Sequence, residues 1–120
     1  MEKRIKYRDA DLSYADIGEG PCVVLLHGYL ESGAIWRSFM ESFPGECRFI
    51  VPDLPGHGAS GTWGKVHGMD ELAGAVLAIL EAEGIARVFL AGHSMGGYVT
   101  MAFVDLFPEK ISAYALVHST

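Results

Sequence analysis

The sequence predicts an α/β fold with a mostly parallel sheet and helices on both faces. Short apolar runs recur along the 120 residues, at 22–26, 49–51, 87–91 and 111–117. Runs that are apolar at nearly every position are typical of parallel strands covered on both faces. Segments with helical apolar spacing separate these runs, and such alternation predicts parallel strands joined by right-handed crossovers.

The chain is expected to begin with an antiparallel hairpin, because residues 3–9 and 11–17 alternate in polarity. Its candidate inward side chains are Tyr7, Leu12, Tyr14 and Ile17. A Gly-Glu-Gly-Pro turn at 18–21 then leads into the first apolar strand.

Three helices are expected between and after these strands. Ser32 is a predicted N-cap for a short helix that ends by Pro44-Gly45. Its apolar residues, assigned to the core, are Ile35, Trp36, Phe39 and Met40. A glycine-rich loop from Asp53 to Gly68 precedes the second helix.

The second helix has apolar residues at positions i, i+4, i+7 and i+8, which form one stripe. They are Leu72, Val76, Ile79 and Leu80. Gly84 is placed to end this helix as its C′ residue. The third helix ends at Pro108, and its apolar residues are Val99, Ala102, Phe103 and Leu106.

Composition narrows the range of partners and locations. The formal net charge is −6 and no Lys/Arg cluster occurs, which argues against nucleic acid or a membrane as a partner. Neither a secretory signal nor a membrane-spanning run is present, so a cytoplasmic location is expected. Cys22 and Cys47 start predicted strands that can be neighbours, and they are interpreted as buried free thiols.

The strand at 87–91 leads into Gly92-His-Ser-Met-Gly-Gly97, with Ser94 at the apex of a sharp strand-to-helix turn. Such a turn holds the serine in a strained left-handed conformation and presents its hydroxyl. Gly92 and Gly96 are required because a Cβ there would collide with the neighbouring strand and helix. The alternative interpretation is an ordinary tight turn. A dinucleotide-binding turn is set aside, because the glycine spacing and the acidic residue it needs are missing.

Polar residues gather where the predicted strands end. His27, Asp53, Ser94 and His118 each follow an apolar run. The carboxyl ends of parallel strands share one rim of the sheet, where ligands bind in α/β folds. One site at this rim is therefore predicted.

Three motifs together resemble the N-terminal half of an α/β-hydrolase. They are Leu-Leu-His27-Gly28-Tyr29, Asp53-Leu-Pro-Gly-His-Gly-Ala-Ser60 and Gly92-His-Ser-Met-Gly-Gly97, each directly after a predicted strand. The resemblance covers residues 1–120 as part of one core domain, truncated after the sixth of the family's eight strands. The cap and the C-terminal part of the family fold are absent from it.

The resemblance implies that Ser94 attacks an acyl carbonyl and forms an acyl-enzyme. The oxyanion hole is then formed by the backbone N–H groups of Tyr29 and Met95. Support for the nucleophile elbow and the oxyanion loop is assigned to His27, Gly28, Gly92, His93, Gly96 and Gly97. No cofactor and no metal are implied. By the same resemblance, dehalogenases and epoxide hydrolases of this fold use an aspartate at the elbow, whereas a serine there implies acyl transfer or, less often, cofactor-free C–C bond hydrolysis.

The base and the acid that activate the serine are not identified within residues 1–120. Asp53 and His57 precede Ser94, whereas the family order is serine, acid, histidine, so both are interpreted as loop-fixing residues. Asp105 is too far from Ser94 along one helix to be the acid. His118 is more readily a wall residue than the base.

The expected function is that of a serine esterase-like hydrolase for a small ester, thioester or related acyl substrate. A complementary C-terminal piece is expected as partner, because the strand at 111–117 would otherwise leave an exposed apolar edge. The alternatives are a non-catalytic protein that binds a small ligand and an inactive fragment.

Overall fold

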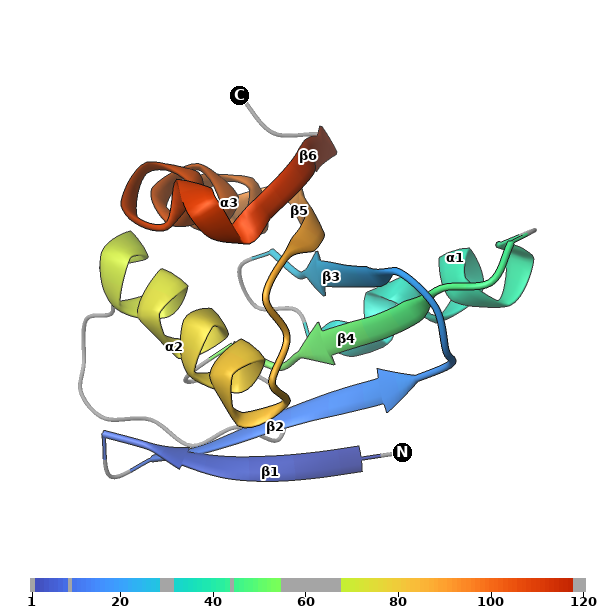
Figure 1. The fold of residues 1–120 in the computed structure, drawn as a ribbon, viewed down its shortest axis with the longest axis horizontal. Helices are drawn as coiled ribbons and strands as arrows, with labels where there is room; N and C mark the ends of the chain where they lie inside the picture. Colours follow the sequence, from blue (N-terminus) through green and yellow to red (C-terminus); the bar gives the residue numbers. More distant parts are fainter. Residues whose placement is uncertain (1, 9, 29–31, 44, 55–67, 118–120) are drawn as a thin grey trace.

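The fold is a six-stranded sheet with strand order β1-β2-β4-β3-β5-β6, shown in Figure 1. The computed structural model describes residues 2–8, 10–28, 32–43, 45–54 and 68–117. In chain order the elements are β1 (Glu2–Tyr7), β2 (Ala10–Ile17), β3 (Cys22–Leu26), the 3₁₀ turn η1 (Gly33–Trp36), α1 (Arg37–Ser42), β4 (Arg48–Pro52), α2 (Met69–Ala82), β5 (Val88–His93), α3 (Met95–Leu106), η2 (Pro108–Lys110) and β6 (Ile111–Val117).

The pairing of the strands confirms the predicted topology. Strands β4, β3, β5 and β6 are mutually parallel. The β1–β2 hairpin is antiparallel, and β2 also runs antiparallel to β4. The four parallel strands therefore bring their carboxyl ends to one rim of the sheet.

Helices cover both faces of the sheet, as the sequence predicts. On one face α2 and α3 pack against alternate residues of the strands, and this core includes Val24, Leu90 and Phe103. On the other face Trp36 of η1 packs with Leu25 and Ala91. The predicted stripe of α2 is confirmed, since all four of its residues are buried.

Two local signals in the sequence are realised at helix ends. The hydroxyl of Ser32 accepts a hydrogen bond from the N–H of Ala34 at 3.3 Å, so Ser32 caps η1. Gly84 has a φ of +67°, as a C′ glycine should. The N–H of Gly84 donates to Glu81 O and that of Ile85 donates to Leu80 O, which is the Schellman arrangement.

Four predicted core residues are instead exposed: Ile17 by 41%, Ile35 by 42%, Phe39 by 45% and Leu106 by 42%. Each was placed inside by its spacing, but spacing cannot reveal whether another element covers that face. Phe39 still makes aromatic contacts with Trp36 and Phe43, with ring centroids 5.8 Å apart in each pair.

The two cysteines are free and half-buried, rather than fully buried as expected. In register, Cys22 pairs with Arg48, so the two thiols do start neighbouring strands. Cys22 packs with the core on the α2 and α3 side, whereas Cys47 packs with the core on the α1 side. Side chains on opposite faces of a sheet cannot form a disulfide bond without moving the backbone.

Strand β6 forms the end of the described sheet and pairs with β5. Tyr114 and Leu116 on this strand are exposed. The predicted exposed apolar strand is thus observed among the residues the structure describes. Of the helices in this part of the chain, none has both the length and the apolar composition that crossing a bilayer requires.

Candidate active site

Ser94 lies between β5 and α3 in a backbone conformation that is rare for a residue with a Cβ. Its φ is 55° and its ψ is −115°, the values of the first central residue of a type II′ turn, which is normally glycine. The positive φ expected from the sequence is therefore observed. Although Ser94 is the N-cap of α3, its hydroxyl makes no capping hydrogen bond, and the residue is exposed. An ordinary N-cap serine would use its hydroxyl for the helix.

Gly92 and Gly96 are held so closely that neither position has room for a Cβ. A Cβ at Gly92 would overlap the backbone carbonyl of Gly96 and the hydroxyl of Thr100. A Cβ at Gly96 would lie 2.6 Å from Leu26 O and 2.7 Å from His27 O. Both predicted steric requirements are confirmed. The turn at Ser94 is thereby packed directly against the end of β3.

The first turn of α3 presents backbone donors beside Ser94. Met95 is the first residue of this helix, so its N–H has no partner four residues earlier within the helix. Gly97, which is buried, donates its N–H to Ser94 O at 2.9 Å. The helix dipole also favours negative charge at this end. Tyr29, the other predicted oxyanion donor, lies outside the described residues.

His27 is completely buried and has a defined tautomer. The N–H of Leu54 donates to His27 Nε2 at 2.8 Å, so this nitrogen carries no proton. The proton therefore sits on Nδ1, which donates to the carbonyl of Gly28 at 2.7 Å. Both ring nitrogens of His27 are thus engaged in holding the loop after β3.

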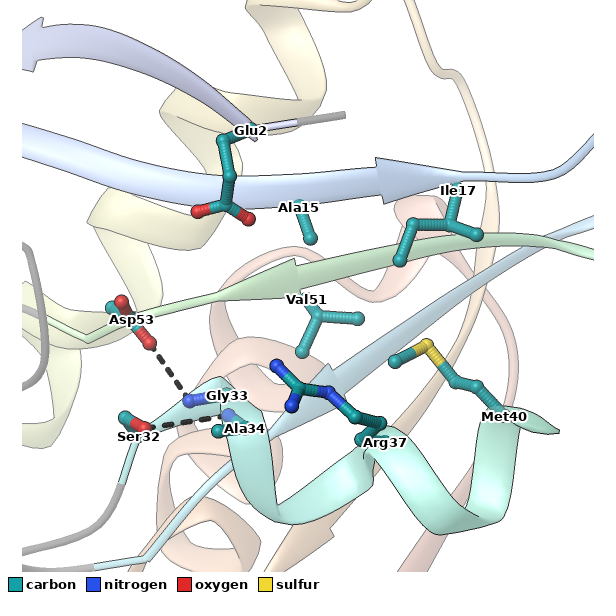
Figure 2. A pocket seen from close by; sticks show the side chains of 10 residues that line it. All are labelled: Glu2, Ala15, Ile17, Ser32, Gly33, Ala34, Arg37, Met40, Val51 and Asp53. Carbon is teal, nitrogen blue, oxygen red and sulfur yellow. Dashed lines mark hydrogen bonds between the residues drawn. The ribbon is translucent and has the colours of Figure 1, made fainter.

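Asp53 fixes the same loop from the other side, as Figure 2 shows. Its Oδ1 accepts a hydrogen bond from the N–H of Gly33 at 2.7 Å. The predicted loop-fixing role of Asp53 is confirmed by this bond. The loops after β3 and β4 are thus joined by two side chains, one from each loop. His57 and His118 lie outside the residues that the structure describes.

The end of β6 is joined to the turn at Ser94. The N–H of Ser94 donates to Val117 O at 3.1 Å, and His93 pairs with Val117 in register. His93 is half-buried and lies on the same face as Ala91, toward α1, because alternate strand residues share a face. Asp105 lies in the last turn of α3, about 16 Å along the axis from Ser94.

Thr100 supports this turn and was not singled out from the sequence. It is completely buried, and its hydroxyl donates to Gly96 O at 2.8 Å. This bond engages the carbonyl of Gly96, at which an added Cβ would collide with the end of β3. A threonine hydroxyl in a helix can bond to the carbonyl four residues earlier whatever that residue is, so its spacing alone carried little information.

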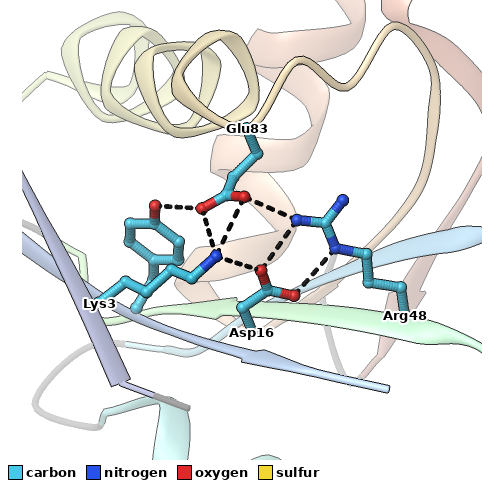
Figure 3. Close-up of polar contacts among 5 residues, drawn as sticks. Lys3, Asp16, Arg48 and Glu83 are labelled. Carbon is cyan, nitrogen blue, oxygen red and sulfur yellow. Dashed lines mark hydrogen bonds and ion pairs between the residues drawn. The ribbon is translucent and has the colours of Figure 1, made fainter. Parts of the chain in front are cut away.

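A cluster of charged residues lies at the opposite end of the sheet, where β4 begins (Figure 3). Asp16 accepts two hydrogen bonds from Arg48, at 2.9 and 2.8 Å, and one from Lys3 at 2.8 Å. Glu83 binds the same two cations, at 2.7 Å from Arg48 and 3.0 Å from Lys3. Tyr14 donates its hydroxyl to Glu83 at 2.6 Å. We call these five residues the amino-end cluster.

The cluster changes the acidity of its members. Hydrogen bonds from Arg48 hold the pKa of Asp16 well below its usual range. The hydrogen bond from Tyr14 is the main reason why the pKa of Glu83 is also lowered. Burial, reinforced by Glu83, raises the pKa of Tyr14. With two cations and two carboxylates, the cluster is neutral and internally paired.

Comparison with known proteins gives the same fold as the structure. The chain belongs to the alpha/beta hydrolase fold family, whose model matches residues 21–120. The dihydrolipoyllysine-residue acetyltransferase component of the acetoin cleaving system of Pseudomonas putida is 39% identical over 103 residues, which are 85% of this chain and 28% of that protein. Epoxide hydrolase B of Mycobacterium tuberculosis is 35% identical over 95 residues, covering 77% of this chain and 27% of that one.

Solved structures give the same result. A thermophilic esterase from Thermogutta terrifontis superposes with a TM-score of 0.92 at 29% identity, over 100% of this chain and 46% of the esterase. The chain therefore spans less than half the length of each of these three proteins.

Proposed function

We propose that this chain supplies the nucleophile of a serine hydrolase that cleaves a small ester, thioester or related acyl substrate. The observation that carries the proposal is Ser94 at positive φ, exposed, with its hydroxyl not used to cap α3. A strained serine is maintained only where the surrounding structure forces it, and such strain is concentrated at functional sites.

In the proposed reaction, Ser94 Oγ forms a bond to the acyl carbon while its proton passes to a general base. The carbonyl electron pair moves to oxygen, and the N–H of Met95 donates to the resulting oxyanion. Collapse of this intermediate expels the alcohol or thiol, which takes the proton from the base. Water then attacks the acyl-enzyme by the same steps and releases the acid. Tyr29 is proposed as the second oxyanion donor.

The base and its orienting acid are proposed to come from a complementary C-terminal piece. Within the described residues, His27 and Asp53 at the rim are committed to holding loops together. The chain also spans less than half of its relatives. A serine hydroxyl is a weak nucleophile without a base, so the isolated chain is expected to react slowly.

Ser94 favours acyl chemistry over epoxide opening. The esterase similarity supports an acyl substrate, whereas the similarity to epoxide hydrolase B raises the alternative. By the family resemblance, epoxide opening uses an aspartate at this position, because an alkyl ester forms on the enzyme. We therefore expect no turnover of an epoxide.

A fluorophosphonate probe tests the proposal. The chain, purified with any C-terminal partner, should label stoichiometrically at Ser94, and labelling should disappear in Ser94→Ala. Ser38→Ala, on the exposed side of α1, is the matched control and should label normally. If Ser94 does not label with such a partner present, the second candidate, a ligand-binding protein without catalysis, is favoured. The engagement of His27 and Asp53 in loop contacts is the observation consistent with that candidate.

A further inference from the structure

A cavity lies on the α1 face of the sheet (Figure 2). Its volume is about 230 Å³. It is bounded by β1 and β2, by the end of β4 and by η1 and α1. None of the residues assigned to acyl transfer lines it within the described chain. Pockets for drug-sized ligands span roughly 300–1,000 Å³, so this cavity suits a ligand of amino-acid size.

Two opposite charges face this cavity. Figure 2 shows the carboxylate of Glu2 and the guanidinium of Arg37 directed into it from β1 and α1. Neither group forms a hydrogen bond or an ion pair with another residue that the structure describes. Asp53 adds a second carboxylate to the lining, while its Oδ1 holds the N–H of Gly33. Among the described residues that line the cavity, one cation thus faces two carboxylates.

Apart from Ser32, whose hydroxyl caps η1, the remaining wall of the cavity is apolar. Val51 lies between the charged groups, and Ile17 and Met40 line the end away from Asp53. Ile17 and Met40 were both assigned to the core from the spacing of apolar residues, yet one is exposed and the other half-buried. A ligand with an aliphatic end would cover side chains that otherwise face water.

We propose that this cavity binds a small zwitterion with an aliphatic side chain, such as a free aliphatic amino acid. Its ammonium group pairs with Glu2 and its carboxylate with Arg37, whose planar fork matches a carboxylate. The side chain packs on Val51, Ile17 and Met40. An amine without a carboxylate would leave Arg37 unpaired. An acid without an amine would leave Glu2 unpaired and would be repelled by the two carboxylates of the cavity. The proposal does not depend on the reaction at Ser94.

Titration of the full 120-residue chain, followed by backbone amide shifts in solution NMR, tests this site. L-Leucine should cause saturable shifts of Gly33, Ala34 and Val51. Isoamylamine, which lacks the carboxylate, and isocaproate, which lacks the amine, should each bind at least about tenfold more weakly, because each loses one charge-assisted pair. Retained dispersion of the spectrum shows that a variant is folded.

Variants locate the two charges. Arg37→Gln and Glu2→Gln should each weaken leucine binding by about tenfold. The matched controls Arg4→Gln and Glu41→Gln remove exposed charges outside the cavity and should leave the binding unchanged. The proposal is overturned if leucine causes no saturable shifts, if isoamylamine or isocaproate binds as tightly as leucine, or if the cavity variants bind leucine like the controls.

Discussion

The two ends of the parallel strands are built on different principles. At the carboxyl end, Ser94 has a strained backbone and is enclosed by glycine contacts without space for a methyl group. At the amino end, four charged side chains and one tyrosine pair with one another around Arg48. The carboxyl end is held in one shape at an energetic cost. The amino end contributes stability through ion pairs and hydrogen bonds that lie away from Ser94. This separation allows a strained residue to be held in a domain that remains folded.

Adding a methyl group to the strained end should have the largest effect. Gly92→Ala should lower the free energy of unfolding by about 3 kcal/mol or more, because its Cβ overlaps the backbone of Gly96. Gly84→Ala is the matched control: it also adds one Cβ, at a φ of +67°, but nothing lies within 4 Å. Its cost should be about 1 kcal/mol, from the left-handed conformation alone. Urea unfolding measures both, and equal losses would contradict the steric account of the turn.

Breaking the amino-end cluster should cost somewhat less. Arg48→Met removes the cation that both carboxylates share, and we expect a loss of about 2–3 kcal/mol. Arg4→Met breaks a pair with Asp11 that is exposed and 3.9 Å long, so it should cost under about 1 kcal/mol. Urea unfolding at neutral pH compares the two. A small loss for Arg48→Met would show that the cluster is not what stabilises this end.

The amino-end cluster also predicts that the stability of the fold falls at low pH. Because the pKa values of Asp16 and Glu83 are lowered in the folded state, their contribution is complete above the unfolded values of about 4. It should be lost progressively as the pH falls below about 5. Thermal unfolding between about pH 7 and pH 3 should therefore show a falling Tm, with a flatter profile in Arg48→Met. Parallel profiles would mean that other carboxylates cause the decline.

The smallest effect is expected at Cys22. Burial raises the pKa of its thiol to about 11, so the neutral form is favoured in the folded state. Its contribution to stability is complete below about pH 9, the unfolded value, and is lost as the pH rises toward 11. Between about pH 9 and pH 10, Cys22→Ala should lose less stability than the parent chain. Equal alkaline slopes would contradict this assignment.

The sequence was sufficient to predict the strands, the crossovers and the position of Ser94. Apolar runs and glycine spacing are local signals, and the turn at Ser94 needs both. It was not sufficient for contacts between distant segments. The hydrogen bond between His27 and Leu54 spans 27 positions, and the pair of Lys3 with Glu83 spans 80. Such contacts depend on how loops and helix ends meet once the sheet has formed.

The exposed apolar residues also show what the sequence alone could not predict. Phe39 and Leu106 have the spacing of buried residues, but the described part of the chain leaves both exposed. The periodicity of apolar residues identifies a helix face that can be buried. It does not identify the element that would cover that face. Thr100 was missed for a related reason, because its importance comes from the backbone of Gly96 and not from a pattern of its own.

We infer that the strained backbone at this turn is retained because position 94 must carry a serine. Replacing Ser94 with glycine tests this inference most directly. Glycine adopts positive φ freely, so Ser94→Gly should raise the free energy of unfolding by about 1 kcal/mol or more and abolish fluorophosphonate labelling. Ser94→Ala should abolish labelling without this gain, because alanine keeps the Cβ. A Ser94→Gly chain that is no more stable than the Ser94→Ala chain, or that still labels, would contradict the account.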